Sequence, residues 1–345
     1  MEPFLSAHNH EDFEVTCYAN VMQRDGVTER LKKYADRWRD IVGLPDEEVA
    51  DLIRRDSIDI LVELAGHTAH NRLLLFARKP APIQVSYLGY TNTTGLSTID
   101  YCLTDIHVDP PGMTESFYTE KMVRVPDTVL CYRVPENSPE ISDLPSLKSG
   151  HITFSSFNNL TKITPGVIVL WSRTLLAVPG SRLLMKAKFF KDQHVEQEIR
   201  QTFEQHGISA DRLELLSWTT GFKEHLEIYH RVDIGLDPFP FNGGTTSFES
   251  LWMGIPVVTL AGNSFVSRMG VRQACNVNLS HLIAQTPDEY VAIATRLAGD
   301  LDQLKQIRAG LRTGVLHSPL MDGPRLARAL GKAYRDMWQS WCSSY

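Results

Sequence analysis

Residues 232–260 read VDIGLDPFPFNGGTTSFESLWMGIPVVTL, and this stretch decides the fold. The apolar run at 232–236 predicts a strand, because a short apolar run bounded by turn residues is typical of a buried strand. Residues 246–253 predict a helix that ends at Gly254, since glycine commonly follows a helix C-terminus. A second apolar run at 255–260 predicts the next strand. Strand, loop, helix and strand in this order are the repeating unit of a parallel sheet.

The same alternation extends in both directions along the chain. Further strands are expected at 13–18, 58–64, 83–88, 99–104, 152–157, 183–185 and 213–218. Helices are expected from Asp46 onward and at 71–76, 166–178, 195–206, 223–231 and 323–341. Mostly apolar strands between amphipathic helices are typical of a parallel sheet covered on both faces, so the sequence predicts an α/β fold.

The length of the chain predicts two domains. It has 345 residues, and single hydrophobic cores rarely grow beyond about 250–300 residues. Residues 133–150 are rich in proline, serine and charge, and they interrupt the alternation as a linker would. We therefore expect one domain at 1–140, a second at 151–322, and a C-terminal helical segment at 323–345 that packs back on the first.

Composition excludes some classes of partner. The formal net charge of -6 gives no electrostatic reason to bind nucleic acid or an anionic membrane. No apolar run is long enough to span a bilayer, and the first residues do not form a signal peptide. The five cysteines are scattered without metal-ligand spacing, as in a reducing compartment. We therefore expect a cytoplasmic protein. The sequence shows no self-similarity at a spacing of 34 residues, so it predicts no helical repeats.

The loop and helix start at 242–247 carry the clearest chemical signal. Gly243 and Gly244 allow the backbone to approach a ligand closely. Thr245 and Thr246 then place hydroxyls and free amide N–H groups at the start of a helix. Such N–H groups, together with the helix dipole, favour a bound phosphate. A capped turn without any ligand is the alternative interpretation of the same residues.

Three other loops follow expected strands, where ligands of α/β sheets bind. Lys162 lies after the strand at 152–157 and could pair with a diphosphate, although a solvated lysine is the alternative. His67 follows the strand at 58–64 and could exchange a proton near neutral pH, although a structural histidine is equally compatible. His225 could stack or hydrogen-bond on a base or ribose, or simply lie on a helix surface.

Three segments together carry a resemblance to a known family. They are residues 78–85 (RKPAPIQV) with the following 88–90 (LGY), residues 158–165 (NNLTKITP) and residues 243–254 (GGTTSFESLWMG). In this order they resemble the catalytic region of O-GlcNAc transferases and their bacterial and Spindly-like relatives. The resemblance implies two Rossmann-like domains facing a cleft, the GT-B type of glycosyltransferase architecture. It also implies inverting transfer of N-acetylglucosamine from UDP-GlcNAc to Ser or Thr hydroxyls of proteins.

The resemblance further implies a role for each matching residue. Lys162 would contact the diphosphate, which the helix start at Thr245 and Thr246, after Gly243 and Gly244, would cap. Asn159 would lie near the phosphates and His225 near the uridine. Glu249 would bind the ribose, and His67 would lie near the sugar and the acceptor. The implied catalytic residues are thus His67 and Lys162.

No metal and no cofactor are expected beside the donor substrate. The sequence contains one Asp-x-Asp pair, Asp300 and Asp302, within a charge-rich stretch that we interpret as a solvated helix face. Positions i and i+2 of a helix point apart, so this pair does not resemble a metal site. Neither a P-loop nor a Rossmann glycine fingerprint occurs.

Departures from the family keep several alternatives open. Relatives usually carry an additional strand, a His-Pro loop and tetratricopeptide repeats before the point that matches Glu2, so we expect an N-terminally truncated first domain and a repeat-bearing partner or segment. Thr91 stands where the family usually has proline, and Gly244 where many members have histidine. The alternatives are fucose transfer from GDP-fucose, glucose transfer from UDP-glucose to Asn, a UDP-GlcNAc 2-epimerase, which residues 158–165 disfavour, and an inactive UDP-binding remnant. Expected partners are a nucleotide sugar and acceptor proteins.

Overall fold

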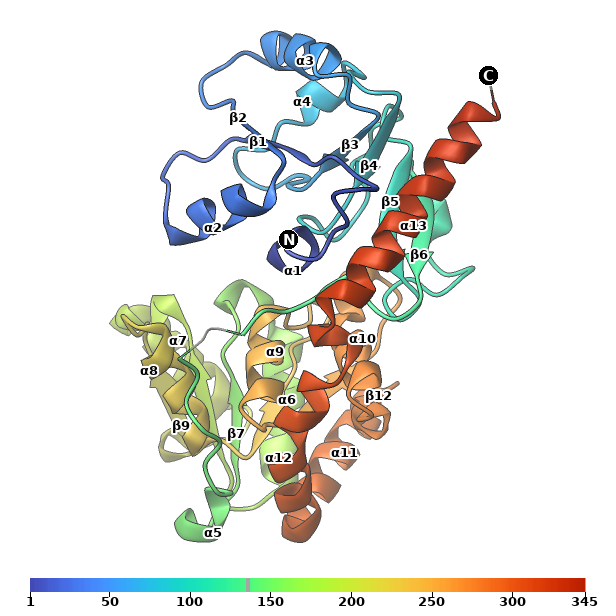
Figure 1. The fold of residues 1–345 in the computed structure, drawn as a ribbon. Coiled ribbons are helices and arrows are strands. Elements are labelled where there is room, and N and C mark those ends of the chain that lie inside the picture. Colours follow the sequence, from blue (N-terminus) through green and yellow to red (C-terminus); the bar gives the residue numbers. More distant parts are fainter. Residues whose placement is uncertain (135–136, 345) are drawn as a thin grey trace. The chain divides into compact units, whose positions relative to one another are not determined.

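A computed structural model describes residues 1–134 and 137–344 (Figure 1). The chain forms two compact units, one of Met1–Arg133 with Pro319–Tyr345 and the other of Val134–Ser318. Both units contain parallel sheets with helices between the strands. The expected fold class, α/β with two Rossmann-like units, is confirmed.

The first unit is built on a four-stranded parallel sheet in the order β3-β4-β5-β6. Its strands are β3 (Ile60–Glu63), β4 (Ile83–Ser86), β5 (Tyr101–Asp105) and β6 (Lys121–Val125). The long helix α13 (Gly323–Cys342) packs against this sheet, as Figure 1 shows. Leu326 and Leu330 of α13 belong to one buried cluster with Ile83, Val85 and Leu103 of the strands. The C-terminal helix is therefore part of the core of the first unit.

The first unit contains two hydrophobic clusters, to which alternate residues of strand β3 contribute. Ile60 and Val62 pack on the cluster that contains α13, whereas Leu61, between them, belongs to a second cluster. Successive strand residues point to opposite faces of a sheet, so the two clusters cover opposite faces. The second cluster joins the sheet to α3 (Asp46–Arg55) and α4 (Leu73–Phe76).

A separate pair of parallel strands precedes this sheet. They are β1 (Thr16–Ala19) and β2 (Arg37–Asp40), connected by α2 (Gly26–Tyr34) and preceded by the short helix α1 (Glu2–Leu5). The prediction of a strand at 13–18 was wrong by three residues at its start, and β2 was not predicted. The sequence of β2, RWRD, is polar and partly exposed, so it lacks the apolar run that identifies a buried strand.

The second unit is a six-stranded parallel sheet in the order β12-β11-β10-β7-β8-β9. Its strands are β7 (Thr153–Ser156), β8 (Arg182–Lys186), β9 (Leu213–Leu216), β10 (Ile234–Leu236), β11 (Val257–Leu260) and β12 (Ile283–Ala284). Its helices are α5 (Ser146–Ser149), α6 (Pro165–Ala177), α7 (Gln193–Gln205), α8 (Phe222–Glu227), α9 (Thr245–Trp252), α10 (Met269–Asn276), α11 (Pro287–Gly299) and α12 (Leu301–Leu316).

The strand order of the second unit creates a topological switch point. From β7 the chain moves outward through β8 and β9, and from β10 it moves outward on the other side through β11 and β12. Crossovers between parallel strands are right-handed, so the connecting helices of the two halves lie on opposite faces of the sheet. A crevice therefore opens beyond the carboxyl ends of β7 and β10, which is where sheets of this kind bind ligands.

Several boundaries differ from those expected. The helix predicted at 71–76 is limited to α4, because the Asn71 side chain accepts the N–H of Leu73 and holds the preceding turn. The helix predicted at 223–231 divides into α8 and a 3-10 turn at Ile228–Arg231. The elements α1, α2, β6, α5, α10, α11 and β12 were not predicted, and of α12 only a helical stretch around Asp300 and Asp302 was expected. No helix among residues 1–134 and 137–344 is both long and apolar enough to cross a bilayer.

The segment expected to be a linker folds largely with the second unit. Residues 135–136 of the expected 133–150 segment lie outside the described residues. Arg312 of α12 donates from Nη2 to the Pro139 carbonyl at 2.7 Å, and Arg308 donates from Nε to the Ser142 carbonyl at 2.8 Å. The unit boundaries accordingly differ from the expected 1–140, 151–322 and 323–345, since the second unit begins at Val134 and the first resumes at Pro319.

Candidate functional site

A small pocket occupies the topological switch point of the second unit. Its walls are the ends of β7 and β10 and the start of α9, namely Ser155, Ser156, Phe157, Asn158, Gly235, Leu236, Asp237, Thr246, Ser247, Ser250 and Val257. The Thr246 hydroxyl donates to Asn158 Oδ1 at 3.2 Å and so joins the start of α9 to the end of β7. The sequence thus brings two of its predicted ligand-binding segments, 158–165 and 243–254, to one pocket.

A buried carboxylate shapes the glycine loop beside this pocket. Asp237, which is 1% exposed, accepts the N–H of Gly243 at 2.6 Å and the hydroxyl of Thr259 at 2.7 Å. Burial raises the pKa of Asp237 to about 6. A Cβ atom on Gly243 would lie 2.1 Å from Ser247 Oγ and 3.1 Å from Asp237 Oδ1, so a larger residue here would displace the Ser247 hydroxyl and crowd Asp237. Sequence reasoning assigned Asp237 no role, although an aspartate that ends a buried strand before a glycine loop is a recognisable signal.

The start of α9 presents unsatisfied backbone donors. The helix begins at Thr245, and no side chain caps it at Gly244. Gly244 has open space where a Cβ would be, so its position does not require glycine. Across the described residues, no hydrogen-bond acceptor faces the N–H groups of Thr245 and Thr246. Such donors at a helix start attract an anion, as the sequence predicted for this segment.

Lys162 brings a cation to the same loop. Its Nζ donates to the Asn242 carbonyl at 2.7 Å and lies 4.0 Å from the centre of the Phe241 ring. Burial lowers the pKa of Lys162, and the charge of Asp237 partly opposes that effect. No carboxylate lies within ion-pair distance of Lys162 in the part of the chain that the structure describes. A partly desolvated ammonium without an ion-pair partner is well suited to an incoming anion.

A second polar chain links β8, α8 and α9. Lys186 Nζ lies 2.6 Å from His225 Nδ1, and His225 Nε2 lies 2.9 Å from Glu249 Oε2. An ammonium only donates and a carboxylate only accepts, so His225 carries its proton on Nε2. Burial lowers the pKa of Lys186, and the charge of Glu249 opposes that shift. Sequence reasoning missed Lys186 because the expected strand at 183–185 ended one residue before it.

The two neighbouring asparagines after β7 differ in position. Asn158 is buried and lines the pocket, where it accepts the Thr246 hydroxyl. Asn159, the residue expected near the phosphates, is exposed, and its Oδ1 accepts the N–H of Thr161 at 3.2 Å. Asn159 therefore caps the 3-10 turn at Leu160–Lys162 in this structure, and Asn158 occupies the pocket wall.

His67 belongs to the first unit, in the loop that follows β3. Its Nε2 lies 2.9 Å from the Thr94 carbonyl, and its ring meets Tyr90 edge-on at 5.1 Å. Because a carbonyl only accepts, Nε2 carries the proton and Nδ1 keeps the lone pair. Glu63 fixes this loop by accepting the N–H of Ala65 at 2.7 Å and of Gly66 at 2.6 Å. Burial raises the pKa of Glu63.

The Asp-x-Asp pair has a capping role. The Asp300 side chain accepts the N–H of Gln303 at 2.9 Å, and Asp302 lies in the first turn of α12. Asp300 was expected within a helix. In the structure it lies at the N-terminus of one, where it caps α12. Both residues are exposed, in agreement with the predicted solvated face.

Comparison with known proteins identifies relatives of the whole chain. The model of glycosyl transferase family 41 matches residues 1–133 and 142–330. A protein of Arabidopsis thaliana, described as a probable UDP-N-acetylglucosamine--peptide N-acetylglucosaminyltransferase SPINDLY, is 42% identical over 99% of this chain and 38% of its own length. The chain therefore spans well under half the length of that curated relative.

Solved structures give the same relationship. A mutant of the Thermobaculum terrenum O-GlcNAc transferase matches with a TM-score of 0.94 and 38% identity, over 99% of this chain and 65% of that one. Anabaena HepE, solved with UDP and glucose, matches with a TM-score of 0.55 and 12% identity over 91% of this chain and 90% of its own, which shows likeness of fold alone. By its sequence and its fold, the chain belongs to glycosyl transferase family 41.

Proposed function

We propose that this chain transfers N-acetylglucosamine from UDP-GlcNAc to Ser or Thr hydroxyls of proteins. The proposal rests on one observation. At the carboxyl ends of the strands of the second unit, Lys162 and the backbone N–H groups at the start of α9 flank the loop at Gly243 and are suited to bind an anion. The relatives support the choice of reaction, since the Arabidopsis protein is described as a peptide N-acetylglucosaminyltransferase and the bacterial one as an O-GlcNAc transferase.

The diphosphate of the donor binds at the start of α9. The N–H groups of Thr245 and Thr246 donate to phosphate oxygens, and the Lys162 ammonium neutralises charge beside them. When the sugar leaves, negative charge grows on the β-phosphate, and donors already in place stabilise it without reorganisation. With these donors in place, the proposed donor site uses no divalent ion.

The nucleoside binds beside the hydrogen-bonded side chains of Lys186, His225 and Glu249. His225 Nε2 donates a hydrogen bond to Oε2 of Glu249, whereas Oε1 of Glu249 accepts no hydrogen bond from the described residues. That free oxygen suits a ribose hydroxyl, because a carboxylate accepts from such donors. Trp218 and Phe222, both exposed in the segment before and at the start of α8, offer ring faces on which a base stacks.

The reaction is a single displacement. The acceptor hydroxyl oxygen bonds to the anomeric carbon while the bond from that carbon to the β-phosphate oxygen breaks. The bonding electron pair leaves with UDP, and attack from the opposite face inverts the anomeric centre. The hydroxyl proton passes to a base or to water. His67 is our candidate for this step or for positioning the acceptor, because its Nδ1 is the unprotonated nitrogen.

A transfer assay tests the proposal. The purified chain is incubated with a library of Ser- and Thr-containing peptides and with UDP-GlcNAc, GDP-fucose or UDP-glucose, each in a separate reaction. Transfer from UDP-GlcNAc is expected. Transfer from GDP-fucose alone, or from UDP-glucose to Asn alone, would contradict the donor assignment while keeping the transferase. Conversion of UDP-GlcNAc to its 2-epimer without transfer would contradict the reaction class.

Two lysine variants test the role of Lys162, and one of them is the control. Lys162→Ala is expected to lower turnover about 100-fold, which is the usual effect of removing one group that stabilises developing charge. Lys148→Ala changes an exposed lysine of α5, at the opposite edge of the same sheet, and is expected to retain full turnover. Equal turnover of the two variants would remove Lys162 from the mechanism.

A further inference from the structure

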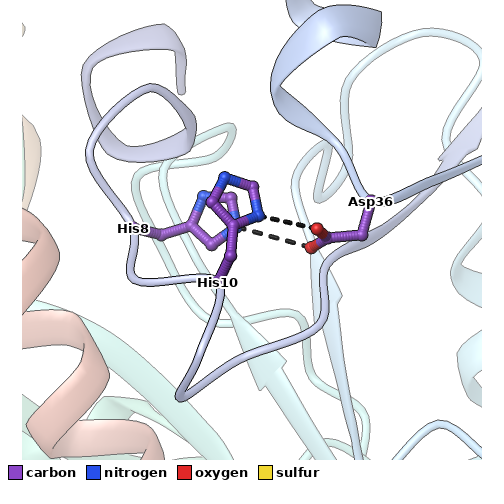
Figure 2. Close-up of side chains that lie close together, drawn as sticks. All are labelled: His8, His10 and Asp36. Atoms are coloured by element: carbon purple, nitrogen blue, oxygen red, sulfur yellow. Dashed lines mark hydrogen bonds and ion pairs between the residues drawn. The ribbon is translucent and has the colours of Figure 1, made fainter.

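A compact group of possible metal ligands lies in the first unit. His8, His10 and Asp36 place their ligand atoms within 4.8 Å of one another. His8 and His10 belong to the loop between α1 and β1, and Asp36 directly precedes β2. Figure 2 shows both imidazole rings directed toward the Asp36 carboxylate. None of the three residues takes part in the nucleotide pocket of the second unit.

His8 has an available nitrogen that no hydrogen bond satisfies. The residue is 8% exposed, and its Nδ1 lies 2.8 Å from the Leu5 carbonyl. The carbonyl only accepts, so Nδ1 is the protonated nitrogen and Nε2 of the neutral ring bears the lone pair. This Nε2 is buried without a hydrogen-bond partner, and its 3.5 Å separation from Asp36 Oδ2 is too long for a hydrogen bond of ordinary length.

The other two groups complete one side of a coordination shell. His10 Nδ1 lies 2.6 Å from Asp36 Oδ1, and the N–H of Val15 donates to Asp36 Oδ2 at 2.7 Å, which fixes the carboxylate. The side chain of His10 is 57% exposed and that of Asp36 is 25% exposed. The cluster is therefore closed on the His8 side and open to water on the other.

The ligand set indicates which class of ion fits. Two imidazole nitrogens and one carboxylate oxygen suit zinc and similar divalent transition metals, whereas calcium and magnesium prefer oxygen alone. Ligands about 2.0–2.2 Å from a tetrahedral zinc are separated by about 3.3 Å from one another. The separation of His8 Nε2 from Asp36 Oδ2, 3.5 Å, is close to that value. The separation of His10 Nδ1 from Asp36 Oδ1, 2.6 Å, is shorter, and rotation of the exposed His10 ring can lengthen it.

We propose that His8 Nε2, His10 Nδ1 and the Asp36 carboxylate bind a divalent transition metal ion, with zinc as the best match and water as the fourth ligand. The Leu5 carbonyl orients the His8 ring, as backbone carbonyls commonly do for metal-bound histidines. The ion joins the loop after α1 to the start of β2. The site is distinct from the donor diphosphate, so it does not alter the expectation that sugar transfer proceeds without a metal.

Metal titration of the full chain tests the site. The purified protein is stripped with a chelator and then titrated with zinc against a chromogenic competitor. Binding of one zinc ion per chain in this assay is expected. Titration with cobalt should give the strong visible absorption of a tetrahedral site. Because His8 is buried and its replacement risks the fold, His10→Ala and Asp36→Asn are the informative variants, and each should weaken zinc binding about tenfold or more.

His206→Ala is the matched control, since His206 is an exposed histidine at the end of α7 in the second unit. Its zinc affinity should equal that of the unmodified chain. Zinc should also raise the melting temperature of the unmodified chain more than that of His10→Ala, because a ligand stabilises the state that binds it. Failure to bind zinc, equal affinity in His10→Ala, or an equal loss in His206→Ala would overturn the proposal.

Discussion

The carboxyl edges of the two sheets use buried carboxylates in the same way and yet present different chemistry. In the first unit Glu63 accepts the backbone N–H groups of Ala65 and Gly66, and in the second unit Asp237 accepts the N–H of Gly243 and the Thr259 hydroxyl. Each carboxylate holds the loop that follows its strand. The first unit then presents the exposed His67, whereas the second presents Lys162 and unsatisfied amide donors.

On the basis of this difference we propose that the charged part of the substrate binds to the second unit. The second unit offers positive charge and N–H donors that its own residues leave unpaired, so its edge is suited to a diphosphate. The first unit offers the His67 imidazole, which we propose for the uncharged sugar and the acceptor hydroxyl. Substitutions at the carboxyl ends of the strands in the second unit should therefore impair nucleotide binding. Substitutions at the corresponding place in the first unit should leave nucleotide binding intact.

The largest effect is expected from Asp237→Ala. The change leaves the Gly243 N–H and the Thr259 hydroxyl without their acceptor and opens a cavity, which together should lower the free energy of unfolding by about 4 kcal/mol. UDP affinity should fall as well, because the glycine loop is no longer held. Urea denaturation and UDP titration measure the two effects. A variant as stable as the unmodified chain would show that Asp237 does not organise this edge.

The pH dependence of stability gives a second prediction. Burial raises the pKa of Asp237 from 3.8 to about 6, so the folded chain binds this proton more tightly than the unfolded chain does. The stability contributed by that proton is present below pH 4 and is lost as the pH rises through 6. Over the whole transition the unmodified chain should lose about 3 kcal/mol relative to Asp237→Asn, and about 2 kcal/mol of this loss should fall between pH 4.5 and pH 7.

Denaturation of both proteins at pH 4.5 and pH 7 checks this sign, since the difference between them should move in favour of the variant at the higher pH. A difference that does not change with pH, or that moves in favour of the unmodified chain, would show that folding does not raise the pKa of Asp237.

Glu63→Ala is the counterpart in the first unit. Two loop N–H groups lose their acceptor, so the free energy of unfolding should fall by about 2 kcal/mol. UDP affinity should remain within about twofold of the unmodified chain, because the diphosphate is assigned to the other unit. Loss of UDP binding in a folded Glu63→Ala protein would contradict the division of roles between the two edges.

The smallest effect concerns Thr246. Its replacement by valine removes the hydrogen bond to Asn158 Oδ1 but keeps the side-chain shape, and this should weaken UDP binding by about 1 kcal/mol, or roughly fivefold. Thr202→Val, on α7, removes a hydroxyl that bonds within its own helix and serves as the control. Equal UDP affinity of both variants would show that Thr246 contributes nothing to the pocket.

Local sequence patterns were sufficient for the fold class and for the glycine turn and helix start at residues 243–254. Residues 243–254 carry their own glycine turn and helix start, so their conformation depends on neighbours along the chain. The choice between Asn158 and Asn159 depends on where β7 ends, and a shift of one residue reverses which side chain points inward. Periodicity predicts such an end only within a few residues. The place of Asn159 near the phosphates was implied by the family resemblance and stays a prediction.

Features made by distant residues could not be predicted in this way. Lys186, His225 and Glu249 come from three separate elements, and only the packing of β8, α8 and α9 brings them together. Arg308 and Arg312 hold residues 139–142 from more than 160 positions away, so a segment with the composition of a linker is part of a folded unit. His8 and Asp36 likewise have no spacing that marks a metal site.

The most direct test of the central claim is calorimetric titration of the purified chain with UDP, alongside Lys162→Ala and Lys148→Ala. We expect micromolar binding by the unmodified chain and by Lys148→Ala, and a tenfold or greater loss in Lys162→Ala, about 1.4 kcal/mol or more. Binding that Lys162→Ala retains in full, or a folded chain that does not bind UDP at all, would contradict the assignment of the nucleotide site to the second unit.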